Sequence, residues 1–252
     1  MTHYMKLQPV PFDKTAEGKK KIELRLFDEK RKKISVGDML VFRNNENLDL
    51  ITATVKALHT FPDFTELYKT LPLTLCGYDE GEEAEPSDME RYYTKEDINK
   101  YGAVGIELCD ITAVRDVKSR LTQPPFLNLL APSVFNPTEE RLQSRAGRYK
   151  GDENICVYAL SREGSYKGIV AFSSGKQAVI HDIAVDPSCR KEGIGKALIR
   201  FIFFLGAETV IAETDDDAVG FYKKCGFTVT ETESDYETKR YLCERRRTWE
   251  NQ

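Results

Sequence analysis

The sequence predicts a mixed α/β protein of two domains, a small β-barrel followed by an α/β domain. Its 252 residues suit one large domain or two ordinary ones. Short strands dominate the first half, whereas strands alternate with helices in the second. Between the halves, the run Gln123-Pro124-Pro125 can continue neither a helix interior nor a central strand. We therefore expect a first domain over 1–117, a linker over 118–130 and a second domain over 131–252.

Composition indicates a folded protein with a hydrophobic core. Hydrophobic residues make up 40% of the chain and charged residues 31%, which is typical of globular domains with slightly raised charge. A formal net charge of −4 argues against broad coating by nucleic acid but leaves room for a local basic site. The 6 cysteines form no Cys-x-x-Cys pair or zinc-like cluster, so we expect no metal. Without a secretory signal or a membrane-length apolar run, we expect a reduced cytoplasmic protein.

Strands account for most of the expected first domain. Residues 22–27 alternate between an apolar face and a polar face. The segments expected as strands are 22–27, 39–43, 51–61 and two within 101–117. Short helices are expected over 63–71 and over 94–102, the latter capped by Thr94. The acidic segment 78–90 has no apolar period, so we expect a solvated or disordered loop there.

The expected second domain mixes helices and strands. Helices are expected over 137–150, with Pro137 near the first turn, over 194–205, and over 215–225 before Gly226. The segments expected as strands are two within 154–174, then 178–185, 209–214, 226–231 and 238–245. This alternation predicts a sheet covered by helices.

Two glycines stand at the start of the helix expected over 194–205, in the pattern Arg190-x-x-Gly193-x-Gly195. The first N–H groups of a helix lack partners within it, and the helix dipole adds partial positive charge there. Glycines let an anion approach these groups closely, so the pattern predicts a phosphate site. It has neither the three glycines of a dinucleotide fingerprint nor the Gly-Lys-Ser/Thr of a P-loop.

This spacing resembles the acyl-CoA diphosphate loop of the GNAT N-acetyltransferase family. The segment "HDIAVDPSCRKEGIGKALI" resembles that family's central strand, loop and helix, and "AETDDDAVGFYKKCGF" resembles its second conserved segment. The resemblance spans most of residues 131–244 and implies an acyl-CoA N-acyltransferase fold with acetyl-CoA as co-substrate. It implies that the diphosphate is held by the backbone of Arg190, Lys191, Glu192, Gly193, Ile194, Gly195 and Lys196. It also implies that the pantetheine arm pairs with the main chain of Ile183, Ala184 and Val185.

The same resemblance implies two catalytic residues. Tyr222 matches the tyrosine that protonates the departing thiolate, and a free tyrosine, with a pKa of about 10, carries a proton at neutral pH. Many members have an acidic base on the central strand, but Val179 occupies the nearest matching position here. His181, two residues on, is therefore the candidate base. The alternative for His181 is a strand histidine that is merely hydrogen-bonded, and the alternative for Tyr222 is an aromatic residue that only packs. Residues 215–217 are expected to cap a helix, with no metal role.

The first domain resembles the ASCH family, a small barrel related to the RNA-binding PUA domains. "EGKKKIELRL", "VGDMLVFRN" and "RYYTKEDINKYGAVGIEL" carry the resemblance, over roughly residues 5–115. Lys20, Glu23 and Arg25 are the candidate ligand-binding residues, because arginine suits bidentate contacts and a carboxylate can accept from cytosine. Some ASCH proteins hydrolyse N4-acetylcytidine with a lysine, a threonine and a glutamate. Lys20 matches that lysine, but Glu23 stands where the threonine would be.

Together these features predict an acetyl-CoA-dependent N-acetyltransferase whose ASCH domain binds RNA or a modified nucleoside. The alternative is an RNA- or nucleoside-binding protein, or an ASCH-type amidohydrolase of an acylated base, with a regulatory GNAT domain. The acceptor amine stays open among protein, polyamine, antibiotic and nucleoside amines. No membrane partner is expected.

Overall fold

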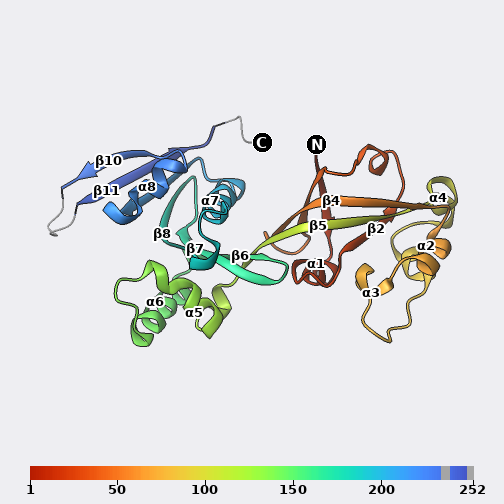
Figure 1. Ribbon diagram of the computed structural model, residues 1–252, viewed down its shortest axis with the longest axis horizontal. Coiled ribbons are helices and arrows are strands. Elements are labelled where there is room, and N and C mark those ends of the chain that lie inside the picture. Colours follow the sequence, from red (N-terminus) through yellow and green to blue (C-terminus); the bar gives the residue numbers. More distant parts are fainter. Residues whose placement is uncertain (234–238, 249–252) are drawn as a thin grey trace. The chain divides into compact units, whose positions relative to one another are not determined.

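The computed structural model describes residues 1–233 and 239–248, which divide into two units (Figure 1). Unit 1 comprises residues 1–113 together with the hairpin turn 161–165. Unit 2 comprises residues 114–160 and the described residues from Tyr166 onward. Both units combine strands and helices, so the predicted two-part mixed α/β architecture is confirmed.

Unit 1 is built on five strands in the order β1-β3-β4-β5, with β2 on the far side of β5. They are β1 Thr2–Leu7, β2 Ile22–Leu26, β3 Met39–Asn44, β4 Leu50–Phe61 and β5 Ala103–Asp116. β1 and β3 are parallel, whereas β3–β4 and β2–β5 are antiparallel. The sequence did not predict β1, whose six residues carry no clear alternation of apolar and polar side chains.

The two ends of this strand order meet through a side chain. Arg25 on β2 donates from Nη2 to the backbone carbonyl of Lys6 on β1 at 2.9 Å. Within residues 1–113 the structure gives β1 and β2 no shared ladder of backbone hydrogen bonds. The seam between β1 and β2 is therefore the place where the strands of unit 1 leave backbone groups accessible.

Four helices complete unit 1: α1 Pro9–Ala16, α2 Phe64–Thr70, α3 Leu73–Cys76 and α4 Lys95–Tyr101. α2 and α4 were predicted, and their caps are Asp63 and Thr94. α1 was not predicted, because prolines open it, but it buries Phe12 in the main core. In the acidic segment, expected as a loop, a 3₁₀ turn over Pro86–Arg91 buries Met89 against α2 and β2.

Unit 2 is built on a six-stranded sheet in the order β6-β7-β8-β9-β11-β10. The strands are β6 Ile155–Arg162, β7 Ser165–Ser173, β8 Gln177–Val185, β9 Thr209–Thr214, β10 Thr228–Thr232 and β11 Arg240–Arg246. β8 and β9 are parallel, whereas β7–β8, β9–β11 and β10–β11 are antiparallel. Each expected strand of this half is present, although the expected first residue of the last strand, Thr238, lies outside the described residues.

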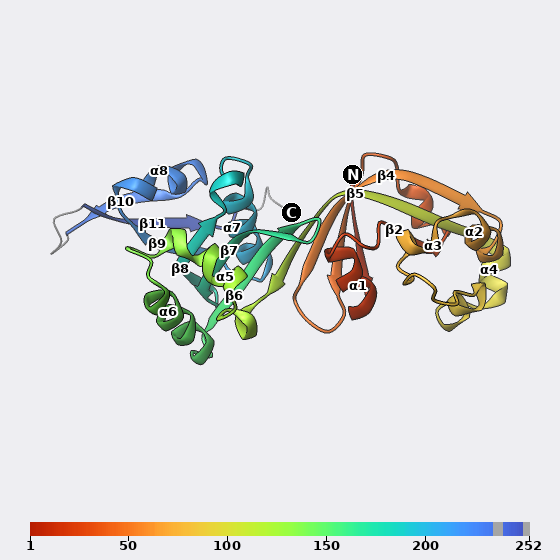
Figure 2. The same ribbon diagram turned by 60° about the horizontal axis from the view of Figure 1, so that its bottom comes forward.

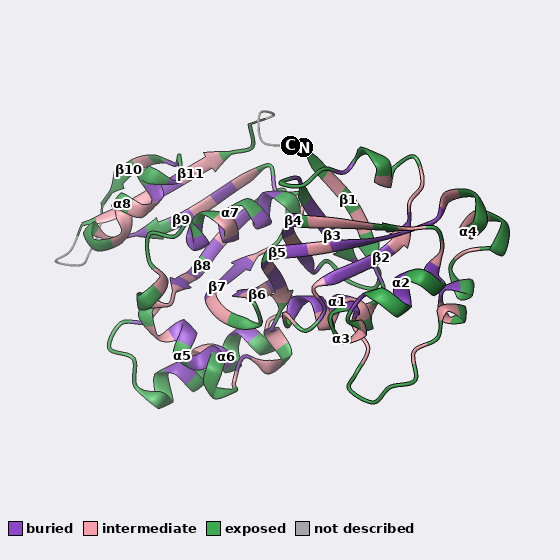
Figure 3. Ribbon diagram, turned by 45° about the vertical axis from the view of Figure 1, so that its right-hand side comes forward, coloured by how far each residue is buried: buried purple, intermediate pink, exposed green. Residues whose placement is uncertain are grey.

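Helices cover both faces of this sheet. α5 Pro124–Leu130 and α6 Glu139–Gly151 pack on the face that carries Val157 and Ala159, and both helices alternate buried and exposed residues (Figure 3). α7 Ile194–Phe204 covers the other face, where the rings of Tyr158 and Phe201 are 4.7 Å apart. α8 Asp216–Lys224 lies beside β10 and β11 (Figure 2). Successive residues of β6 thus face opposite layers, as the twofold period of a strand requires.

The expected linker over 118–130 is wrong, because this segment folds into unit 2. Pro124 and Pro125 occupy the first turn of α5, where a missing N–H and a fixed φ do no harm. Leu121 and Leu130 are fully buried in the core beneath α6. The double proline starts a helix here, whereas the sequence pattern suggested a domain boundary.

Candidate functional site

The predicted phosphate loop joins β8 to α7. Asp186 accepts a hydrogen bond from the Ser188 N–H at 2.9 Å and so starts a short 3₁₀ turn. Farther on, Lys191 has a φ of 69° and Gly193, the N-cap of α7, has a φ of 83°. Both lie in the left-handed region that glycine adopts with little strain. Gly193 is therefore required by the backbone turn into α7.

The first N–H groups of α7 are free. Those of Gly193, Ile194, Gly195 and Lys196 make no hydrogen bond to any part of the chain that the structure describes. The first bond of the helix runs from the Ala197 N–H to the Gly193 carbonyl at 2.9 Å. The space beside Gly193 is open, since an added Cβ there would meet no atom within 4 Å. Unpaired donors at a helix N-terminus form a site for an anion.

Gly195 has a second role that the sequence did not show. A Cβ at this position would lie 2.7 Å from Cε2 and 2.8 Å from Cζ of Phe221 on α8. Side-chain atoms never approach a Cβ so closely, so only glycine lets the ring lie against the start of α7. The two glycines are therefore needed for different reasons, Gly193 for the turn and Gly195 for helix packing.

β8 separates from β9 halfway along its length. The parallel pairing with β9 ends at Ile180, whereas β8 stays paired with β7 as far as Val185. One residue past the end of β8, the Asp186 N–H donates to the Lys167 carbonyl of β7 at 2.9 Å. Because backbone groups alternate along a strand, those of Ile183 and Val185 point to the side that β9 has left. This edge can accept an extended ligand as an added strand.

His181 is the extra residue of a bulge in β8. Ala171 on β7 pairs with Asp182 and Phe172 pairs with Ile180, so His181 has no opposite residue. Its Nε2 lies 2.6 Å from Oγ of Ser173. Partial burial lowers the pKa of His181, the charges of Arg148 and Arg145 lower it further, and Asp182 opposes them. The imidazole is therefore neutral at pH 7 and able to accept a proton.

Asp182, next to His181, is a buried carboxylate that holds α6 to the sheet. Its side chain is 3% exposed. It accepts a hydrogen bond from the Tyr149 hydroxyl and a charged one from Nη1 of Arg145 at 3.0 Å. Arg145 also donates to the Tyr149 hydroxyl at 3.3 Å. A buried charge requires such partners, and here both come from α6.

Tyr222 on α8 is 5% exposed and packs between Phe221 and Phe227. Burial raises its pKa well above the ordinary value, and nearby groups, among them Asp182, raise it further. Its hydroxyl makes no hydrogen bond to the residues described in 1–233 and 239–248. Tyr222 thus keeps its proton at any pH near neutrality, with the hydroxyl free to donate it.

In unit 2 the structure relates His181, Tyr222 and the free edge of β8 through Asp182. The charge of Asp182 acts on the pKa of both His181 and Tyr222, and the free edge of β8 begins one residue later. Sequence reasoning missed Asp182 itself. The signal was present, because Asp182 lies between Ile180 and Ala184 on the buried face of β8, where an isolated charge implies a partner.

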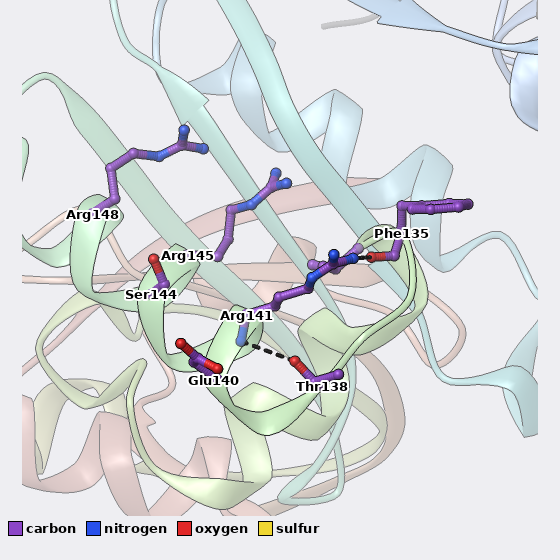
Figure 4. A pocket seen from close by; sticks show the side chains of 8 residues that line it. Phe135, Thr138, Glu140, Arg141, Ser144, Arg145 and Arg148 are labelled. Carbon is purple, nitrogen blue, oxygen red and sulfur yellow. Dashed lines mark hydrogen bonds between the residues drawn. The ribbon is translucent and has the colours of Figure 1, made fainter. Parts of the chain in front are cut away.

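A cavity of about 690 Å³ lies along α6 and the residues before it, and it too was not predicted. Its lining residues are Val134, Phe135, Thr138, Glu140, Arg141, Ser144, Arg145 and Arg148. Figure 4 shows the side chains of Arg141, Arg145 and Arg148 extending from one side of α6 in the same direction. Arg145 links this cavity to Asp182.

In unit 1 the structure brings together Lys20, Glu23 and Arg25. Nζ of Lys20 lies 3.3 Å from Oε2 of Glu23, and Nε of Arg25 lies 2.8 Å from Oε1. Lys20 also donates to the Cys76 carbonyl at 2.7 Å, and both Lys20 and Glu23 are 5% exposed. Burial raises the pKa of Glu23, but the two cations outweigh it and leave that pKa below its ordinary value. Of these three residues, Arg25 also lines the cavity described next.

That cavity, of about 530 Å³, lies at the seam between β1 and β2. Its lining residues are Thr2, His3, Tyr4, Met5, Lys6, Arg25, Lys30, Arg31, Lys33 and Ile34. Arg31 is paired with Asp28 at 2.9 Å, whereas Lys6, Lys30 and Lys33 form no ion pair within the described part of unit 1. The seam is therefore basic, with Tyr4 68% exposed beside it.

Neither a metal centre nor a membrane span is found in the part of the chain that the structure describes. No three His, Cys, Asp or Glu side chains among residues 1–233 and 239–248 gather closely enough to hold an ion. Of the described helices, none is both long enough and apolar enough to cross a bilayer.

Comparison with known proteins finds similarity in each unit. Residues 5–112 match the family model described as "ASCH domain", and residues 152–229 match that described as "Acetyltransferase (GNAT) domain". A peptidyl-lysine N-acetyltransferase of Salmonella typhimurium, YjaB, is 48% identical over 48 residues, which cover 18% of this chain and 33% of that protein. The chain thus spans about a third of the length of this curated relative.

Two solved structures illustrate the structural similarity. The ribosomal-protein-S18-alanine N-acetyltransferase of Escherichia coli is 18% identical, with 53% of this chain and 92% of that chain covered and a TM-score of 0.41. The hypothetical protein PH0355 is 31% identical, with 43% of this chain and 97% of that chain covered and a TM-score of 0.37.

Proposed function

We propose, from the premise that this chain belongs to the GNAT acetyltransferases through residues 152–229 and carries an ASCH domain over residues 5–112, that it is an acetyl-CoA-dependent N-acetyltransferase. Both family resemblances found in the sequence are thereby confirmed. The observation that supports the proposed activity best is the row of unpaired N–H groups from Gly193 to Lys196 beside the free edge of β8.

These two features fit the two ends of coenzyme A. The diphosphate would be held by the N–H groups at the start of α7, assisted by the exposed cations Lys191 and Lys196. The amide groups of pantetheine would pair with the backbone of Ile183 and Val185 as an added strand. Acetyl-CoA supplies an activated acetyl thioester, and the protein contributes the orientation of that thioester.

The reaction needs one base and one acid. In transfer, a bond forms between the acceptor nitrogen and the acetyl carbonyl carbon, the carbon–sulfur bond breaks, and the thiolate takes up a proton. His181, neutral at pH 7, would remove the proton from the amine. Tyr222, whose raised pKa keeps it protonated, would supply the proton to the thiolate.

Calorimetric titration of the full chain with acetyl-CoA tests this function. We expect saturable binding of one molecule and release of free coenzyme A once an acceptor is added. Absence of binding at millimolar acetyl-CoA would overturn the assignment.

We further propose that unit 1 binds RNA or a nucleotide at the basic seam between β1 and β2. Three unpaired lysines attract phosphate, and Tyr4 offers a ring on which a base can stack. The hydrolase alternative has less support, because Lys20 is held by Glu23 and the Cys76 carbonyl. Gel shifts with transfer RNA at low salt should show binding that weakens when Lys6, Lys30 and Lys33 become Gln. Identical mobility with and without the protein would exclude this role.

A further inference from the structure

The cavity along α6 carries an inference about the acetyl acceptor. Arg141, Arg145 and Arg148 are spaced by four and three residues, so they lie on one face of the helix and all line the cavity. Among the described residues that line this cavity, Glu140 is the one acidic side chain. The three arginines outnumber Glu140 and the buried carboxylate of Asp182, which pairs with Arg145, so the cavity has a net positive charge.

Two of these arginines have no carboxylate partner. Arg141 donates from Nη1 to the backbone carbonyls of Phe135 at 3.1 Å and Asn136 at 3.4 Å. Arg148 lies over the ring of Tyr149, 5.2 Å from its centroid. Within residues 1–233 and 239–248 neither of the two forms an ion pair. Both are exposed, so their remaining N–H groups are available to a ligand.

The cavity adjoins the proposed reaction centre. Arg145 has its guanidinium bonded to Asp182, the residue of β8 that immediately precedes the free edge. Arg148 stacks on the ring of Tyr149, whose centroid lies 6.2 Å from that of His181. The charges of Arg148 and Arg145 also lower the pKa of His181. A molecule bound between Arg141 and Arg148 would therefore lie on the same helix face as the guanidinium that contacts Asp182 of β8.

We infer that the acceptor is a small amine that carries an anionic group, a carboxylate or a phosphate, and that Arg141 and Arg148 bind this group. The inference rests on the proposed acetyltransferase function and specifies its substrate class. The planar guanidinium fork of arginine suits both anions, because it donates two parallel hydrogen bonds. Phe135, which also lines the cavity, adds an exposed apolar side chain at its rim. Polyamines are excluded as preferred acceptors, since their charges would be repelled.

Anion binding by the full chain saturated with coenzyme A tests the inference directly. Coenzyme A occupies the diphosphate loop, so the part of phosphate or acetate binding that is lost on replacement of the arginines reports on the arginine cavity, and comparison of the two anions separates phosphate from carboxylate recognition. For the preferred anion, we expect the double variant Arg141→Gln/Arg148→Gln to weaken binding by about tenfold or more. Lys150→Gln, which removes one charge from α6 outside the cavity, should bind as the wild type does.

Turnover provides the second measurement. With acetyl-CoA fixed, kcat/KM should be higher for phosphoethanolamine or γ-aminobutyrate than for ethanolamine or putrescine, and the double variant should lose this preference. Arg148→Gln alone, which breaks no hydrogen bond of the loop before α6, separates loss of binding from misfolding of that loop.

The outcomes distinguish the two proposals. Lack of saturable binding of either anion by the wild type, or equal anion affinity in the wild type and the double variant, would overturn the inference. If acetyl-CoA still bound normally, the acetyltransferase function would stand. Failure of acetyl-CoA to bind any of these proteins would instead refute the function itself.

Discussion

Gly195 at the start of α7 lies against the ring of Phe221 on α8, so closely that an added Cβ would be 2.7 Å from Cε2. The residue after Phe221 is Tyr222, the proposed acid. The contact therefore couples the position of the proposed diphosphate loop to that of the proposed acid. Glycine is needed here for packing between the helices, besides any effect on anion approach.

Replacement of Gly195 by Ala should separate α7 from α8. We expect a loss of about 1–3 kcal/mol in the free energy of unfolding, because the ring has to move, and a fall in kcat as Tyr222 moves with it. Gly147→Ala is the control, since a Cβ there meets no atom within 4 Å on helix α6, and it should stabilise the protein by about 0.5–1 kcal/mol. Urea unfolding measures both, and equal stability of the two variants would contradict the packing role.

The effect of substitutions at Gly193 on stability should depend on the backbone φ that the new residue tolerates and hardly at all on the size of its side chain. Its φ of 83° is left-handed and no atom lies within 4 Å of an added Cβ. Gly193→Ala should cost about 1–2 kcal/mol of stability and weaken acetyl-CoA binding in calorimetry. Gly193→Asn has the larger side chain but tolerates this φ better, so it should cost less than Ala. The reverse order would show that steric conflict, not strain, governs the position.

Tyr222→Phe should slow turnover while leaving the calorimetric affinity for acetyl-CoA unchanged. Loss of a general acid reduces kcat by about 10²-fold, and the phenyl ring keeps the packing against Phe221 and Phe227. Because its raised pKa keeps the wild-type hydroxyl protonated, the rate should show no alkaline decline from this group below pH of about 10. Tyr241→Phe, at an exposed hydroxyl bonded to Asp216, is the matched control. A Tyr222→Phe enzyme of normal rate would remove it from the mechanism.

His181 should determine the acid limb of the pH–rate profile. Its pKa is lowered in the folded protein, mainly by burial and with help from Arg148, so the neutral base persists below the ordinary pKa of about 6.5. The midpoint of kcat/KM should therefore lie below that pH. Arg148→Gln should raise it, because a positive charge is removed, whereas Lys150→Gln should leave it in place. An unchanged acid limb in His181→Asn would assign the base to another group.

Glu23 should make the stability of unit 1 depend on pH. Its pKa is lowered by Lys20 and Arg25 despite burial, so the ion pairs stabilise the fold above the ordinary pKa of about 4.3, and this contribution is lost as pH falls through the lowered value. At neutral pH Glu23→Gln should cost about 3 kcal/mol, a difference that shrinks in acid. Glu66→Gln, which breaks only an exposed pair with Lys69, should change nothing measurable. A constant difference between the wild type and Glu23→Gln from pH 7 to pH 3 would contradict this pairing.

The local patterns of this chain were sufficient for most of its elements. Period-two and helical spacings predicted the six strands of unit 2 and the helices α6, α7 and α8, because burial of one face imposes those periods. The glycine loop was equally visible, since a left-handed turn and a helix start need particular residues at particular positions. This loop lies within residues 152–229, which match the acetyltransferase (GNAT) domain.

Sequence patterns were insufficient where the role of a residue depends on partners that are distant in the chain. The double proline at 124–125 by itself predicts a domain boundary, whereas the structure shows it in the first turn of α5, above a buried core. Ligand binding by Lys20 and Glu23 stays a prediction, and what the sequence did not show is that the fold buries them against each other and against the Cys76 carbonyl. Charge on a strand indicates a function or a buried partner equally well until the opposite residue is known.

The sequence alone therefore determined the succession of strands and helices in this protein and the loop that precedes α7. The packing of α6 on β8 alone decides that Arg145 reaches Asp182. This contact joins residues 37 apart in the chain, and its geometry depends on how helices pack on the sheet, which no short window of sequence records. The family could be recognised from the sequence, whereas the acceptor class could be argued only from the fold.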